Sequence, residues 1–320
     1  MLTKREKIAY GLGDTASNII FQTVMLFLTF FYTDIFGISP AIVGTLFLVV
    51  RVVDAITDPL MGALTDSTRT KWGSYRPYLL WLALPFGVIS MITFTTPNLP
   101  ESGKVIYAFV TYTLLMLVYT AINIPYSALG GVLSGDPKER VSIQSYRFVF
   151  GMLGGLIVSA CTLPLVNWLG KGDNATGYQL TMALMSGLGV ILFLICFRFT
   201  KERVAAHNSS SLSWKNRMST LWQNGPFKVL CFAAFMLLTS MVLRTTLAIY
   251  YVKYVLGEAE LVTYFVTIGM IGNILGCACA NPLSKRVDKK TAYIRLQYIS
   301  AAISCVAFWL PGEQLILAFV

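Results

Sequence analysis

The sequence predicts an all-α protein that crosses a lipid bilayer many times. Of its 320 residues, 56% are hydrophobic and only 12% are charged, whereas a soluble domain has about 25% charged residues. The mean hydropathy is +0.66. The apolar residues gather in runs of about 20 residues or more, which is long enough for a helix to cross a bilayer. Lysine and arginine are abundant in every second connecting loop, as in polytopic membrane proteins.

Nine apolar runs and the start of a tenth are predicted to be membrane-spanning helices. Short linkers containing Gly, Pro, Asp or Lys separate them, and Gly and Pro in particular interrupt helices. In chain order the predicted spans are residues 11–35, 40–64, 78–97, 105–133, 142–168, 178–199, 227–256, 260–282, 291–311 and 313 onward.

The basic residues predict the orientation of these spans. One set of loops is rich in lysine and arginine: Lys4, Arg5, Lys7, Arg69, Lys71, Arg76, Lys138, Arg140, Lys201, Arg203, Lys215, Arg217, Lys285, Arg286, Lys289 and Lys290. The opposite loops contain only Lys104, Lys171 and Lys253. Because positive loops stay in the cytoplasm, we expect a cytoplasmic amino terminus. This distribution also explains the net charge of +10 without nucleic-acid binding.

A long polar linker predicts two halves. We expect a six-helix half over residues 1–200, a cytoplasmic linker over 201–226 and a partial second half over 227–320. Two six-helix halves joined in this way are the plan of the major facilitator fold. About nine to ten of its twelve helices are present, so we expect the chain to be truncated.

Three ionisable residues lie inside the second predicted span. Arg51, Asp54 and Asp58 interrupt the apolar run 42–64, where each charge costs roughly 2.5–3.5 kcal/mol. Spacings of three and four residues place them on one helical face. We therefore expect this face to line a protein or water-filled interior that forms part of an ion or substrate path. The alternative is a purely structural ion pair with Arg51.

Several segments in the same order resemble the glycoside–pentoside–hexuronide:cation symporters, the melibiose permease-like family. They are Tyr10–Asp14, Phe31–Asp34, Gly44–Leu48, Arg51–Pro59, Arg69–Pro77, Asn123–Tyr126 and Tyr146–Phe148. The resemblance covers the first half and continues more weakly through Tyr250–Val255.

The resemblance implies a cation site at Asp54 and Asp58, with hydroxyl oxygens from Thr57 and Thr120. Independently of it, two nearby carboxylates repel, so they should hold a proton or share a cation. The family prototype has asparagine where Thr57 stands. This departure favours a proton over sodium as the coupling ion.

The resemblance also implies a sugar site. Sugar recognition needs paired donors and acceptors together with an aromatic face, and the matching positions are Asn18, Tyr119, Asn123, Ser127 and Arg147. The prototype has acids at the positions of Asn18 and Asn123 and tryptophan at Ser127, so melibiose is not the expected sugar. The alternative is hydrogen bonding between helices without a substrate.

The pattern Gly62-x-x-x-Asp66-x-x-Arg69 resembles the cytoplasmic loop motif of facilitators. It implies a gating role for Asp66 and Arg69, with Arg140 of the next cytoplasmic loop as a further candidate. The alternative is ordinary positive charge at the cytoplasmic face.

These observations predict cation-coupled transport of a glycoside, a pentoside or small oligosaccharide, across a bacterial inner membrane by alternating access. The expected partners are the sugar, the cation and the lipid bilayer, and the protein is expected to be monomeric. An enzyme is not expected, because the sequence has no metal cluster, catalytic histidine or nucleotide-binding loop; for the same reason no cofactor is expected. The alternative function is a non-transporting remnant or a membrane sensor that binds sugar.

Overall fold

The computed structural model describes residues 2–204, 219–220, 222–250 and 268–308, apart from residues 270, 273, 278, 281 and 284–286. Every regular element within these residues is a helix, which confirms the all-α prediction. In chain order they are α1 (Lys4–Thr23), the π-helical turns η1 (Val24–Leu28) and η2 (Phe31–Ile35), α2 (Pro40–Ser67), α3 (Arg76–Thr93), α4 (Glu101–Val132), α5 (Pro137–Gly170), α6 (Asn174–Phe199), α8 (Gly225–Tyr250) and α10 (Lys289–Phe308).

Five of the described helices, α2 to α6, are long and apolar enough to cross a membrane. They match the predicted spans from 40–64 to 178–199, with ends that differ by a few residues. Of the later predictions, 227–256, 260–282 and 291–311 lie partly outside the described residues, and the start of a tenth span at 313 lies wholly outside them.

The first span begins earlier than residue 11. The Thr3 hydroxyl accepts a hydrogen bond from the Glu6 amide, and the Glu6 carboxylate accepts one from the Thr3 amide. This capping box satisfies amides at the helix end and starts α1 at Lys4. At its other end α1 continues through the π-helical turns η1 and η2. The charged first turn therefore belongs to the same helix as the buried residues that follow.

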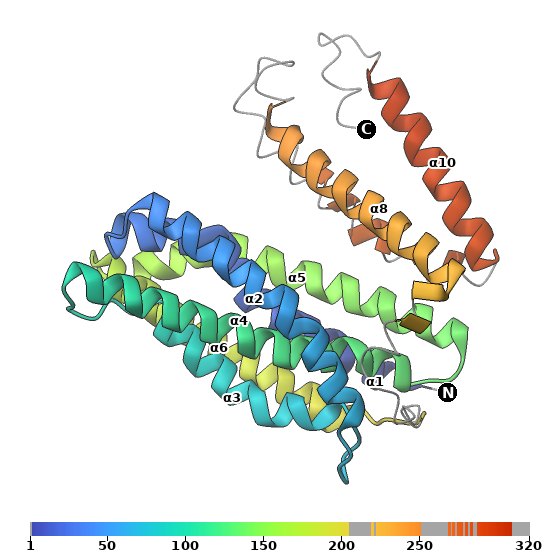
Figure 1. Ribbon diagram of the computed structural model, residues 1–320, viewed down its shortest axis with the longest axis horizontal. Helices are drawn as coiled ribbons and strands as arrows, with labels where there is room; N and C mark the ends of the chain where they lie inside the picture. Colours follow the sequence, from blue (N-terminus) through green and yellow to red (C-terminus); the bar gives the residue numbers. More distant parts are fainter. Residues whose placement is uncertain are drawn as a thin grey trace. The chain divides into compact units, whose positions relative to one another are not determined.

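The chain forms two compact units, Met1–His207 and Asn208–Val320. In the first, α1 packs chiefly against α5 and α6, α3 packs against α4 and α6, and α2 packs against α4. Figure 1 shows these helices lying alongside one another. At the centre of the unit the rings of Tyr10 (α1) and Tyr126 (α4) stack with centroids 4.8 Å apart. Both rings are fully buried.

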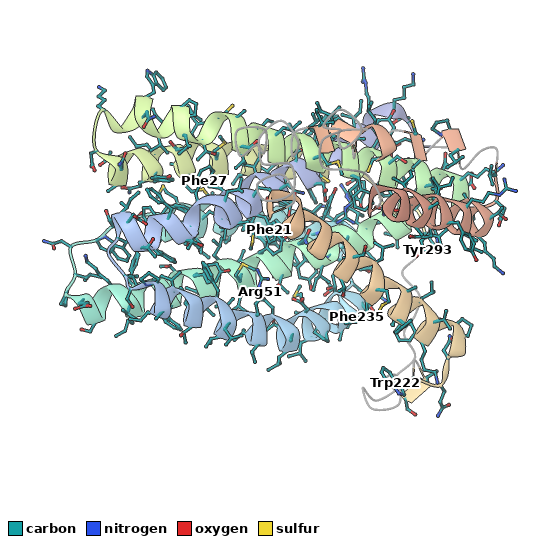
Figure 2. The ribbon with its side chains drawn as sticks, turned by 90° about the horizontal axis from the view of Figure 1, so that it is seen from above. Phe21, Phe27, Arg51, Trp222, Phe235 and Tyr293 are labelled. Atoms are coloured by element: carbon teal, nitrogen blue, oxygen red, sulfur yellow. The ribbon has the colours of Figure 1, made fainter. Side chains whose placement is uncertain are left out.

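The described part of the second unit contains the helices α8 and α10. Large apolar side chains on both are exposed within the unit, among them Phe235 of α8 and Ile299 of α10; Phe235 is labelled in Figure 2. Exposed apolar faces of this kind are typical of helices that contact lipid or another helical unit. The side chain of Arg244 lies outside the described residues.

Candidate functional site

The acidic residues of α2 occupy different environments. Asp54 is buried, and its Oδ2 lies 3.3 Å from Nη1 of Arg51, whose side chain is half exposed. Figure 2 labels Arg51 on this helix. The other carboxylate oxygen of Asp54, Oδ1, is buried without a hydrogen-bond partner among the described residues. The ion pair considered as an alternative is therefore present, but it satisfies only one oxygen of the Asp54 carboxylate.

Asp58 connects α2 to α4. Its Oδ1 accepts a hydrogen bond from the Thr120 hydroxyl over 2.9 Å, and Thr120 itself is buried. The Thr57 hydroxyl donates to the backbone oxygen of Val53 in its own helix. The structure thus brings Asp58 and Thr120 together directly. Thr57 lies between Asp54 and Asp58 along α2, and no hydrogen bond joins it to either carboxylate in the described residues.

The five predicted sugar-binding residues lie on α1, α4 and α5. They take part in two chains of hydrogen bonds. On one side Ser127 of α4 accepts a hydrogen bond from Nη2 of Arg147 over 3.0 Å. On the other, the Asn123 amide donates to the Tyr119 hydroxyl over 3.2 Å, and its oxygen accepts a weaker bond from Ser17 over 3.4 Å. Because Asn123 and Ser127 are one helical turn apart on α4, both chains lie on one face of that helix.

Asp14 was not among the predicted site residues. It is buried on α1, and its Oδ1 accepts a hydrogen bond from Nε of Arg147 over 2.9 Å. The Asn18 amide donates to its backbone oxygen over 2.9 Å and to Oδ2 over 3.3 Å. The available signal was an aspartate four residues before Asn18, the spacing that places two side chains on one helical face.

Aromatic rings border this polar network. The ring of Tyr119 stacks on that of Phe21 of α1 with centroids 5.2 Å apart, and Figure 2 labels Phe21. The guanidinium of Arg147 lies 5.1 Å from the centre of the Tyr126 ring. The site therefore combines hydrogen-bonding groups with aromatic faces, as a small-molecule site requires.

The two gating candidates of the predicted cytoplasmic motif contact each other through the backbone. Nη1 of Arg69 donates to the backbone oxygen of Asp66 over 2.8 Å and to the hydroxyl of Ser74 over 3.0 Å. The Asp66 carboxylate instead accepts a hydrogen bond from the Tyr75 hydroxyl over 3.0 Å. Burial raises the pKa of Tyr75 to about 12, and the Asp66 carboxylate adds to the shift, so the hydroxyl stays protonated as the donor.

Glu202 anchors the same loop and was not among the predicted residues. Its two oxygens accept hydrogen bonds from the backbone amides of Ser74, Tyr75 and Arg76, over 2.9, 2.8 and 3.0 Å. Gly73 has φ +111°, and a Cβ there would overlap the Glu202 carboxylate. The carboxylate thus satisfies amides at the start of α3 and ties the end of α6 to this loop.

Arg140, the third gating candidate, was expected in the loop before the fifth span but lies in the first turn of α5. Its Nε donates to the backbone oxygen of Ser134 over 2.8 Å. No described contact joins Arg140 to Asp66 or Arg69, so the structure does not bring the three gating candidates into one cluster.

Comparison with known proteins identifies the chain. The family model described as MFS/sugar transport protein matches residues 9–320. The chain belongs to this family. The predicted resemblance to glycoside–pentoside–hexuronide:cation symporters is confirmed, as is the polytopic major facilitator fold. Members of the MFS/sugar transport family are transporters, which also confirms that the chain is not an enzyme.

Three relatives illustrate the match. YagG of Escherichia coli (strain K12), assigned as a glycoside/cation symporter, is 44% identical over 318 residues, which is 99% of this chain and 69% of the relative. The inner membrane symporter YicJ of the same organism is 42% identical over 100% of this chain and 69% of its own length. The isoprimeverose transporter of Lactiplantibacillus pentosus is 36% identical over 97% of this chain and 65% of its own length.

Proposed function

We propose that this member of the MFS/sugar transport family carries out cation-coupled symport of a glycoside, a pentoside or small oligosaccharide, by alternating access in the bacterial inner membrane. A proton is the proposed coupling ion. Family membership and the assignment of two similar relatives as symporters support this class of activity.

The observation that carries the proposal is the position of the two candidate sites on α4. Thr120 donates to Asp58 of α2, and Asn123, three residues further along α4, joins the polar network with α1. Residues three apart on a helix are neighbours on its surface. Ligation at either site acts on the same turn of α4, which supplies a physical route for coupling. Such coupling is reciprocal, so the cation strengthens sugar binding by the factor by which the sugar strengthens cation binding.

The unpaired carboxylate oxygen of Asp54 supports the proposed cation site. A buried oxygen without a donor is costly, and Asp54 Oδ1 is such an oxygen. Protonation of this carboxylate would remove the buried negative charge. A proton needs only one oxygen, whereas a hard metal cation needs a shell of several oxygen ligands. The hydroxyl of Thr57 is directed to its own helix backbone, which favours the proton further.

The polar network supports the sugar site. Asn18, Asn123 and Ser127 supply small donors and acceptors, Arg147 supplies a strong donor, and Tyr119 supplies an aromatic face. Their positions on three different helices mean that a bound sugar would contact α1, α4 and α5 at once. We further propose that the protein is monomeric, that its amino terminus is cytoplasmic and that it needs no cofactor.

Uptake of radiolabelled glycosides tests the proposal. Everted or right-side-out vesicles containing the chain are given a proton gradient or a sodium gradient, and accumulation is measured with and without a protonophore. Accumulation that depends on the proton gradient is the expected result. Asp58→Asn should abolish uphill accumulation, whereas Asp34→Asn, at an exposed position on η2, is the matched control and should not.

Two outcomes would contradict the proposal in different ways. Accumulation driven by sodium alone would replace the proton as the coupling ion and leave the transport class unchanged. Saturable sugar binding without any uptake or exchange would instead favour a sugar-binding membrane sensor.

A further inference from the structure

The ion pair between Asp14 and Arg147 lies in the middle of the proposed sugar site. Arg147 is the only arginine or lysine among the five proposed sugar residues, and its Nε edge is occupied by the Asp14 carboxylate over 2.9 Å. Both side chains are largely buried, with 18% of the Arg147 side chain and 10% of the Asp14 side chain exposed. Within the described residues, this pair therefore contributes no net charge to the site.

Contacts from α1, α4 and α5 hold the Asp14 carboxylate and the Arg147 guanidinium in position. Gly151 of α5 lies where a Cβ atom would overlap Oδ2 of Asp14. The Asn18 amide donates to the same oxygen. On the other side of the guanidinium, Ser127 accepts from Nη2 and the Tyr126 ring lies against its face. Each of these contacts fixes one part of the pair, so the carboxylate and guanidinium present a defined arrangement.

The remaining charges on α2, which packs against α4, do not offset this neutrality in favour of an anion. Arg51 contacts Asp54, and Asp58 contacts only the neutral hydroxyl of Thr120 among its described side-chain partners. In a medium of low dielectric constant, a carboxylate brought near these acids is repelled more strongly than in water.

We propose that Asp14 is a specificity-determining residue: by neutralising Arg147 it restricts the site to uncharged glycosides and excludes hexuronides. This inference rests on the proposed sugar-transport function and names the charge class of its substrate. A uronate carboxylate binds best to an arginine through two parallel hydrogen bonds, and here Asp14 already uses one edge of the guanidinium. Hydroxyl groups of a neutral sugar can instead accept from the remaining N–H groups and donate to the Asp14 carboxylate.

The exclusion has two physical parts. The positive charge that would attract a uronate is compensated, and the Asp14 carboxylate repels the incoming anion. Repulsive groups of this kind generate specificity by penalising the wrong ligand. Removing the Asp14 charge while keeping its shape should therefore shift selectivity toward anionic sugars.

Equilibrium binding to the purified full chain in lipid nanodiscs tests the proposal. The probes are p-nitrophenyl xylosides and glucosides, both anomers, and the corresponding p-nitrophenyl glucuronides, which carry a carboxylate in place of the glucoside hydroxymethyl group. The wild type should bind at least one neutral glycoside more tightly than the glucuronide of the same configuration. In Asp14→Asn this ratio should fall by roughly tenfold or more, mainly because glucuronide binding tightens.

Two variants separate charge from other effects. Asp14→Asn combined with Arg147→Gln leaves no unpaired charge and should also disfavour the glucuronide. Asp34→Asn is the matched acid-to-amide control at a site outside the network. Thermal melting of each variant establishes that it is folded.

The outcomes decide the proposal clearly. A wild-type chain that binds the glucuronide as tightly as the neutral glycoside would overturn the specificity role of Asp14 while supporting sugar binding. An unchanged preference for the neutral glycoside in folded Asp14→Asn would also overturn the specificity role of Asp14. A preference for the glucuronide in the double variant would overturn it too. If the single variant does not fold, the double variant decides whether Asp14 has this role. A wild-type chain that binds neither class would overturn the proposed sugar function together with this inference.

Discussion

The hydroxyl of Thr120 on α4 donates a hydrogen bond to the carboxylate of Asp58 on α2 over 2.9 Å. This contact joins the helix that contains the acidic pair to a helix that contributes to the polar network. It gives the two proposed sites a common element.

Replacing Thr120 with valine keeps the shape of the side chain and removes the donor. A hydrogen bond to a charged group contributes about 1.5–3 kcal/mol, so we expect coupled sugar accumulation to fall by roughly tenfold or more. Thr120→Ser retains the hydroxyl and should accumulate sugar nearly as well as the wild type. Steady-state sugar accumulation in vesicles is measured for both variants. Equal accumulation by the valine and serine variants would contradict a role for the Thr120 hydroxyl.

Asp58→Asn should separate transport from coupling. The amide cannot carry the charge or the proton of the carboxylate, so accumulation against a gradient should be lost. Sugar exchange between two equal pools needs no net cation movement and should remain measurable. Loss of exchange together with accumulation, in a variant with an unchanged melting temperature, would instead place Asp58 in sugar binding.

Gly151→Ala should disrupt the network through sterics alone. The added methyl group overlaps the Asp14 carboxylate, and overpacking of this kind costs typically about 1–3 kcal/mol. We expect a lower melting temperature and weaker sugar binding. Gly187→Ala is the matched control on α6, because no atom lies within 4 Å of its added Cβ and alanine favours helix over glycine. A melting temperature in Gly151→Ala equal to that of the control would show that the carboxylate has room to move.

Glu202→Ala should destabilise the loop before α3. Three backbone amides lose a charged acceptor, and we expect a loss of about 1.5–3 kcal/mol in the free energy of unfolding. Glu101→Ala removes an exposed acid in the first turn of α4 and serves as the control, with a much smaller effect. Thermal unfolding in detergent measures the difference.

A double-mutant cycle with Gly73→Ala sharpens this prediction. The alanine methyl group would displace the same carboxylate, so the effects of Gly73→Ala and Glu202→Ala should be less than additive. Fully additive losses would show that Gly73 is required only for its positive φ.

Much of the fold was predictable because membrane helices leave a strong signal in the sequence. The apolar runs predicted α2 to α6 within a few residues, since a bilayer demands a minimum apolar length. The start of α1 was missed, because its first turn is charged and is fixed by the Thr3–Glu6 capping box rather than by hydropathy. The residues that complete the second half lie partly outside the described structure.

The candidate site was predictable as a set of positions and not as a set of contacts. The resemblance to the symporter family, together with their polarity inside apolar spans, identified Asn18, Asn123 and Arg147. Polar groups at membrane depth are costly and must be satisfied. Periodicity could not choose the partner of Arg147 among the acids of other helices. Asp14 was not among the predicted site residues, because it stands near the start of the predicted span 11–35.

The sequence by itself determined that this chain forms apolar membrane-spanning helices, which of their positions are polar and which family it resembles. Only the tertiary structure decided that Asp14 pairs with Arg147, that Thr120 bonds to Asp58, and that Glu202 holds the loop before α3. The physical reason is that helix formation depends on local composition and on the length of each apolar run. The pairing of buried charges depends on which helices pack together, and glycines such as Gly151 allow the close approach that makes those pairs possible.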